Sequence, residues 1–285
     1  MQRIAIMQGR LQAPQGGMFQ CFPRDSWREE FPHAAAAGLD AIEWIYDLQG
    51  ADVNPLATSA GIAEMQTLSR EHHIDVVSVC ADYFMDRPFV TASPDEFAPL
   101  TTHLLWLLDR CRLAGITRIV LPFVDASRIE TPAQESQVVA MLADVLPHAA
   151  AAGVELHLET SLGPMEFAVL LGHWPHPMLK ANYDSGNSSS LGYDVRRELA
   201  AYGPRIGSVH IKDRVRGGGT VPLGEGNADI PALFSGLAAI PYRGDFVLQV
   251  ARGTAGDEVA WALRNRLYLV RRLEEAHFSL SGSAL

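Results

Sequence analysis

Short apolar runs recur along the chain, and each is followed by a longer segment with helical periodicity. The runs cover residues 4–7, 39–44, 74–80, 117–122, 154–159, 180–184, 206–211 and 245–250. Nearly continuous apolar runs are typical of strands buried on both faces, and their alternation with helices predicts parallel β-α units. Eight such units in 285 residues favour a single-domain α/β protein, a (β/α)8 TIM barrel over residues 1–276.

The structural alternative is an open, doubly wound sheet. No G-x-G-x-x-G motif follows the first apolar run, which disfavours a dinucleotide-binding version of that fold. Glycines at 38, 115 and 153 follow Ala-rich segments and predict helix ends, because glycine readily adopts the left-handed conformation that stops a helix. Ser26, Ser93 and Thr131 are expected to cap helix starts, and residues 277–285 to form a frayed tail.

Composition narrows the class of protein. The formal net charge of −10 disfavours nucleic acid as a partner, because nucleic-acid affinity comes largely from neutralising phosphates. Three separated cysteines without a C-x-x-C pair indicate neither a disulfide framework nor a thiolate zinc site. The first apolar run is too short for a signal peptide, and no run approaches a membrane span. A soluble, cytoplasmic protein is therefore expected.

Polar side chains stand at the ends of several predicted strands, where a barrel of this kind builds its active site. They are Glu43, Glu159, Asp184, His210 and Gln249. A single Glu or His at such a place is often only a cap or a satisfied polar group. Glu159, Asp184 and His210 end successive strands, however, and together they predict an oxygen and nitrogen site for Mn2+, Mg2+, Co2+ or Zn2+.

Six segments resemble the xylose-isomerase-like barrels, especially the sugar-phosphate isomerases and epimerases near hexulose-6-phosphate isomerase and L-xylulose-5-phosphate 3-epimerase. They are residues 7–11, 39–44, 156–160, 182–187, 209–213 and 223–226. The resemblance covers essentially the whole chain. It implies a small sugar or sugar phosphate as substrate, and it is consistent with a homo-oligomer. It also implies metal ligands at Glu159, Asp184 and His210 and a fourth on the last strand. That fourth residue is typically Glu in the family and is Gln249 here.

Gln249 changes the expected chemistry. An amide oxygen still binds a hard cation, but an amide does not act as a general base near neutral pH. We therefore expect a one-base aldose–ketose isomerisation through an enediolate, with Glu159 or Glu43 as the proton carrier, rather than a two-base epimerisation. A catalytically impaired sugar-binding relative and a polyol dehydratase are the alternatives. An abasic-site endonuclease is disfavoured by the acidic charge and the few strand-end histidines.

Substrate contacts are expected after the seventh predicted strand. A glycine-rich loop at 217–219 with nearby cations suits an anionic sugar, and the candidate contacts are Lys212, Arg214 and Arg252. A solvated loop is the other interpretation of this segment. Asn187 is a candidate for binding a sugar hydroxyl, and Glu225 for closing over the substrate.

Overall fold

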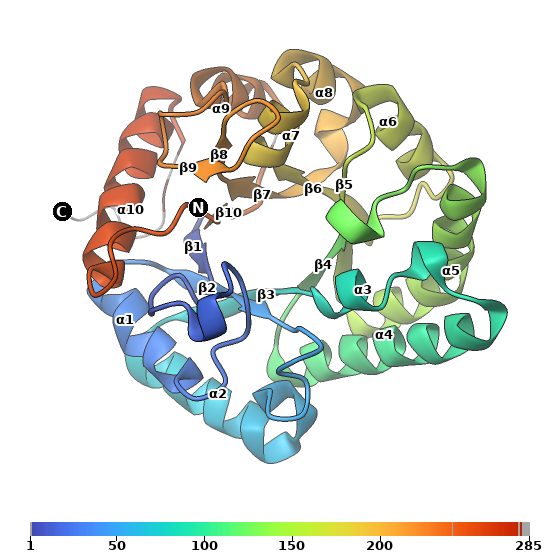
Figure 1. Ribbon diagram of the computed structural model, residues 1–285, viewed down its shortest axis with the longest axis horizontal. Coiled ribbons are helices and arrows are strands. Elements are labelled where there is room, and N and C mark those ends of the chain that lie inside the picture. Colours follow the sequence, from blue (N-terminus) through green and yellow to red (C-terminus); the bar gives the residue numbers. More distant parts are fainter. Residues whose placement is uncertain (1, 241, 279, 281–285) are drawn as a thin grey trace.

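The computed structural model describes residues 2–240, 242–278 and 280. Within them, eight parallel strands close into a barrel surrounded by helices (Figure 1). Around the barrel the strands follow the order β1-β10-β7-β6-β5-β4-β3-β2. β1 pairs with β2 on one side and with β10 on the other, so the sheet has no open edge. The predicted TIM barrel is confirmed, and the open sheet is excluded.

The strands and helices have the following bounds. The barrel strands are β1 (Ile4–Met7), β2 (Ala41–Ile45), β3 (Asp75–Cys80), β4 (Arg118–Phe123), β5 (Glu155–Thr160), β6 (Leu179–Asp184), β7 (Ile206–Ile211) and β10 (Phe246–Leu248), and β8 (Asp213–Arg214) pairs with β9 (Thr220–Val221) in a small hairpin. The helices are α1 (Glu30–Ala36), α2 (Ser59–His72), α3 (Tyr83–Asp86), α4 (Pro94–Ala114), α5 (Pro132–Ala152), α6 (Pro164–Gly172), α7 (Ser185–Leu191), α8 (Val195–Tyr202), α9 (Ile230–Ala239) and α10 (Glu258–Glu275). None of the helices in the described residues is long and apolar enough to cross a membrane.

The predicted strands lie within a few residues of the observed ones, and most helix signals are confirmed. Gly38, Gly115 and Gly153 all have positive φ, between 69° and 80°, where their helices end. Thr131 caps α5 by accepting from the Gln134 backbone N–H. The prediction that Ser26 caps a helix is wrong. A short 3-10 turn over Trp27–Glu29 follows Ser26, and the Ser26 side chain forms no capping hydrogen bond.

The C-terminal segment is not entirely a tail. Phe278 packs edge-on against Phe234 and Phe246, with ring centroids 6.4 and 5.4 Å away. Leu280 forms an isolated bridge with Gln2. The expected frayed tail is thus attached to the barrel at these two residues, while 279 and 281–285 lie outside the described residues.

Asp245 joins two arginines next to the N-terminal ends of the strands. Arg3 contacts it through Nε at 3.1 Å and Nη2 at 2.9 Å, and Arg118 contacts it through Nη2. Asp245 and Arg118 are both buried. Burial alone would raise the pKa of Asp245, but Arg118 and Arg3 hold it below its usual value. The carboxylate therefore neutralises a buried cation at the end of the barrel remote from the strand-end cluster.

We expect Asp245→Asn to lower the free energy of unfolding by about 3 kcal/mol at pH 7, because it leaves the Arg118 charge buried without a counterion. Since folding lowers the pKa of Asp245, its contribution is complete above the unfolded pKa of about 4 and is lost as the pH falls below it. Urea unfolding at pH 7 and pH 3 measures both effects. The control is Asp52→Asn, which breaks an exposed pair with Arg24 and should change stability by less than about 1 kcal/mol. Equal losses in the two variants would contradict this interpretation.

Candidate active site and metal centre

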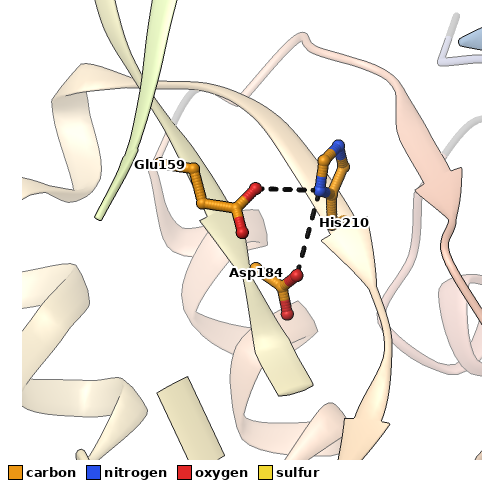
Figure 2. A group of neighbouring side chains, drawn as sticks. All are labelled: Glu159, Asp184 and His210. Atoms are coloured by element: carbon orange, nitrogen blue, oxygen red, sulfur yellow. Dashed lines mark ion pairs between the residues drawn. The ribbon is translucent and has the colours of Figure 1, made fainter. Parts of the chain in front are cut away.

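Glu159, Asp184 and His210 meet where β5, β6 and β7 end (Figure 2). Each offers one ligand atom, and the three atoms lie within 4.8 Å of one another. His210 Nδ1 is 3.1 Å from Glu159 Oε2 and 3.9 Å from Asp184 Oδ2. Strand register explains the closeness, because Asp184 and His210 are paired positions of β6 and β7. The structure thus brings together the three residues that the sequence suggested as metal ligands.

Glu43 lies behind His210 and fixes its ring. His210 Nε2 donates to Glu43 Oε1 at 2.6 Å, and Ser78 Oγ donates to Glu43 Oε2 at 2.6 Å. Burial alone would raise the pKa of Glu43, but His210 and Ser78 lower it, so the group is an ionised acceptor. Glu43 is fully buried in the middle of β2 rather than at its end. Its carboxylate obliges Nε2 to carry a proton, and the other ring nitrogen faces the two carboxylates.

Two ligand atoms of this cluster lack hydrogen bonds. His210 Nδ1 and Asp184 Oδ2 are buried without a hydrogen-bond partner among the described residues, although Lys212 Nζ forms an ion pair with Asp184 Oδ2 at 2.9 Å. Burial would lower the pKa of His210, but Glu43 and Glu159 raise it to about 10. Carboxylate oxygens and a ring nitrogen facing one another repel unless a positive charge lies between them. A proton or a metal ion supplies that charge, and the oxygen and nitrogen donors fit a divalent cation.

Both oxygens of Glu159 are held by amides. Asn182 Nδ2 donates to Oε2 at 2.8 Å, and Asn187 Nδ2 donates to Oε1 at 2.6 Å. Burial would raise the pKa of Glu159, but His210, Lys212 and Asn182 lower it. Asn187 also donates its backbone N–H to Asp184 Oδ1 at 2.8 Å. Asn187, which the sequence suggests as a contact for a sugar hydroxyl, lines the cavity, and its side-chain amide orients Glu159.

A second layer of polar residues lies inside the barrel below these carboxylates. Ser208 Oγ donates to Asn182 Oδ1 at 2.6 Å, which leaves the Asn182 amide group facing Glu159. His157 Nδ1 contacts the same Ser208 hydroxyl at 2.7 Å. Our interpretation of the sequence missed these residues, although a signal was present. Each stands two positions before a cluster residue, so the alternation of a strand places it on the same face.

The mouth of the barrel holds a cavity of about 430 Å3 that reaches Glu159. This volume suits a small organic ligand. Its walls are formed by the loops after β1, β2, β3 and β4 and by the segments that follow β6, β7 and β10. The lining residues are Met18, Phe19, Gln20, Cys21, Asp47, Gln49, Cys80, Asp82, Met85, Asp86, Pro122, Val124, Asp125, Glu159, Asn187, Lys212, Arg214, Gly219, Thr220 and Gln249.

Gln249 lines this cavity, and its amide orientation is determined by its neighbours. Gln20 Oε1 accepts from Arg10 Nη2 at 3.0 Å, so only a donor can approach it from the other side. Gln249 Nε2 is that donor, at 3.0 Å. Gln249 Oε1 is therefore turned away from Gln20, and it is buried without a hydrogen-bond partner among the described residues. The sequence analysis assigned no role to Gln20, or to Arg10 of the family-like segment 7–11, because both lie in the loop after β1.

The predicted anion contacts separate into two groups. Lys212 and Arg214 line the cavity. Lys212 Nζ pairs with Asp184 Oδ2 at 2.9 Å, and Arg214 Nη1 donates to Asn187 Oδ1 at 2.8 Å. Arg252 lies outside the cavity lining and donates instead to the backbone carbonyls of Phe19 and Gln12.

Glu225 is exposed and also lies outside the cavity lining. Asp213 explains its position, because the Asp213 carboxylate accepts from the backbone N–H groups of Gly224, Gly226 and Ala228. These three bonds curl the loop around Asp213. The loop residue predicted to cover the substrate is therefore held away from the site in this structure.

Comparisons with known proteins identify the family of the fold. The family model described as xylose isomerase-like TIM barrel matches residues 31–268. A putative L-ribulose-5-phosphate 3-epimerase from Escherichia coli K12 is 27% identical, over 89% of this chain and 93% of its own length.

Solved structures show the same fold. An L-ribulose 3-epimerase superposes with a TM-score of 0.73 and 22% identity, covering 97% of this chain and 96% of its own. A xylose isomerase-like barrel from Mycobacterium smegmatis in complex with magnesium superposes with a TM-score of 0.72 and 19% identity, covering 97% of this chain and 98% of its own. Because the family model spans most of the chain, this protein belongs to the xylose isomerase-like TIM barrel family.

Proposed function

We propose that this protein is a divalent-metal-dependent isomerase or epimerase of a small sugar or sugar phosphate. The observation that carries the proposal is the buried cluster of Glu159, Asp184 and His210 beside the cavity, whose ligand atoms lie within 4.8 Å of one another. The relative named as an L-ribulose-5-phosphate 3-epimerase, alike over nearly its whole length, supports the same class of reaction.

Glu159, Asp184 and His210 would hold the metal ion, and the unpartnered Gln249 Oε1 is the candidate fourth ligand. The donors are oxygen and nitrogen, which suits Mn2+, Mg2+, Co2+ or Zn2+. When bound, such an ion supplies Lewis acidity that lowers the cost of negative charge on the substrate oxygens of an enediolate.

Glu159 is the proton carrier in this proposal. It is ionised, reaches the cavity and has both oxygens oriented by Asn182 and Asn187. A carboxylate in this state accepts a proton from the carbon next to a sugar carbonyl. Glu43, the other carrier suggested by the sequence, does not line the cavity and is occupied by His210 and Ser78. We assign Glu43 the role of positioning His210.

Lys212 and Arg214 give the cavity a positive side. They follow β7, whereas Asp82 and Asp125 follow β3 and β4 on another wall. An anionic end of the substrate would therefore lie toward Lys212 and Arg214, and its neutral hydroxyls toward the acidic wall. A ketose phosphate and the matching free ketose, assayed side by side, distinguish the two substrate classes.

Mn2+ binding is expected to release about one proton per chain at pH 8. The pKa of His210 is about 10 in the metal-free protein, so its Nδ1 carries a proton that the ion must displace. Affinity should consequently rise with pH up to about 10. Isothermal titration calorimetry in two buffers of different ionisation enthalpy measures the release, and binding without proton release would contradict the assignment of His210 as a ligand.

Replacing Glu43 by Gln is expected to weaken Mn2+ binding by about 10–100-fold, because the ring of His210 loses its ionised partner. The same variant should release fewer protons at pH 8, since the pKa of His210 falls with the loss of that charge. Glu71→Gln, at an exposed position of α2, is the matched control. Unchanged affinity and proton release in Glu43→Gln would refute the positioning role.

The reaction itself is tested in D2O with Mg2+ and a panel of ketopentoses, ketohexoses and their phosphates. The wild type should incorporate deuterium next to the carbonyl, and Glu159→Gln should slow this exchange by about 10²–10⁴-fold, because an amide accepts no proton. Mass spectrometry and proton NMR follow the exchange, with Glu71→Gln as the control. Ligand-induced thermal stabilisation without any exchange would instead indicate a sugar-binding relative that lacks catalysis.

A further inference from the structure

A chain of hydrogen bonds leads from Gln249 to a second carboxyl group in the cavity. Gln20 Oε1 accepts from Arg10 and from Gln249, so its amide nitrogen must face the opposite way. Gln20 Nε2 donates to Asp82 Oδ2 at 2.8 Å. Asp82 lies between β3 and α3, and like Glu159 it lines the cavity (Figure 1 shows α3 inside the ring of outer helices).

Asp82 is hydrogen-bonded but not neutralised. Its Oδ1 accepts from the Cys80 thiol at 3.2 Å, so both of its oxygens are oriented by uncharged donors. In the part of the chain that the structure covers, no Lys, Arg or His forms an ion pair with it. Among the other carboxylates that line the cavity, Glu159 approaches His210 at 3.1 Å, and Asp47 accepts from the backbone N–H groups of Phe22 and Gly50. Asp86 and Asp125 also line the cavity but are exposed to solvent, whereas Asp82 is partly buried.

The local environment lets Asp82 exist in both protonation states. Burial raises the pKa of Asp82 to about 6, and the negative charges of Asp47 and Glu159 act in the same direction. Cys80 stays a neutral thiol, because burial raises its pKa well above the usual value. A carboxyl group that titrates close to neutral pH both donates and accepts protons efficiently.

We propose that Asp82 is the second proton carrier of this site, acting on the substrate from a different wall of the cavity than Glu159. The inference rests on the proposed function and deepens it, because two carriers allow the configuration of a carbon to be inverted. It also revises the one-base expectation drawn from Gln249. The amide at 249 carries no proton, but through Gln20 it orients a carboxyl group that does.

The proton balance of the step is complete within the site. Glu159 takes the proton from the carbon next to the carbonyl, and the electron pair of that C–H bond moves into the enediolate. Protonated Asp82 then delivers its proton to the same carbon from the other side and becomes ionised. Glu159 ends protonated, and exchange with water restores the starting state. The reverse reaction uses the two groups in exchanged roles.

The test compares two rates in D2O with Mg2+ for wild type and Asp82→Asn. They are inversion at the carbon next to the ketose carbonyl, and deuterium incorporation without inversion. Asp82→Asn should lose inversion by at least about 100-fold while its incorporation without inversion stays within about fivefold of the total exchange in the wild type. The remaining carboxylate, Glu159, still removes and returns the proton on one side. Asp82→Ser is a second variant with the same expectation, and Asp144→Asn, an exposed position on α5, is the charge-matched control.

The outcomes separate the two ideas. If the wild type exchanges no deuterium with any sugar tested, the proposed function fails. If it exchanges and inverts, but Asp82→Asn inverts at the wild-type rate, Asp82 is not the second carrier. If inversion and exchange fall together in both Asp82 variants while Mn2+ affinity and melting temperature are kept, Asp82 only binds substrate, and the inference is overturned. A selective loss of inversion supports it.

Discussion

The site depends on the hydrogen bond between Glu43 and His210 in the middle of the barrel. It is short, fully buried and formed with an ionised acceptor. Because Glu43 requires a proton on Nε2, the remaining nitrogen of the ring faces Glu159 and Asp184. The cluster can then hold a cation, since His210 Nδ1 and Asp184 Oδ2 form no hydrogen bond among the described residues and Asp184 Oδ2 has only the ion pair with Lys212. A single interaction thereby orients three strand-end residues as candidate metal ligands.

Amide side chains orient carboxyl groups on both sides of the cluster. Below it, Ser208 determines which end of the Asn182 amide faces Glu159. Above it, Arg10 determines the direction of Gln20. An amide presents a donor at one end and an acceptor at the other, so an orientation imposed at one end determines the partner at the other. Buried carboxyl groups can in this way be aligned through amides, which carry no charge.

Most of the cluster followed from the sequence because strand ends converge in a barrel. Glu159, Asp184 and His210 could be placed together without any knowledge of side-chain packing. Glu43 was predicted for the same mouth, but β2 continues to Ile45, so its carboxylate lies one layer deeper. The position of Arg252 could not be predicted, because its partners are backbone carbonyls of the loop after β1. Gln20 and Asp82 also depend on where loops lie, and only the place of Asp82 just after a strand hinted at its role.

Gln249 is neutral and Asp82 is a carboxyl group, and Gln20 links the two through hydrogen bonds. This arrangement explains why a neutral amide suits the position just after β10. Glu159 and Asp184 together match the charge of a divalent ion, and an amide at 249 adds an oxygen without adding charge. A carboxylate at 249 would face Gln20 Oε1, which Arg10 already directs toward it, and two acceptors would then oppose each other. Turning Gln20 around would only move that conflict to Asp82, which needs the Gln20 donor. Gln249 and Asp82 are therefore compatible with each other through Gln20. In the proposed mechanism Asp82 does not bind the ion, so its carboxyl group keeps the capacity to carry a proton.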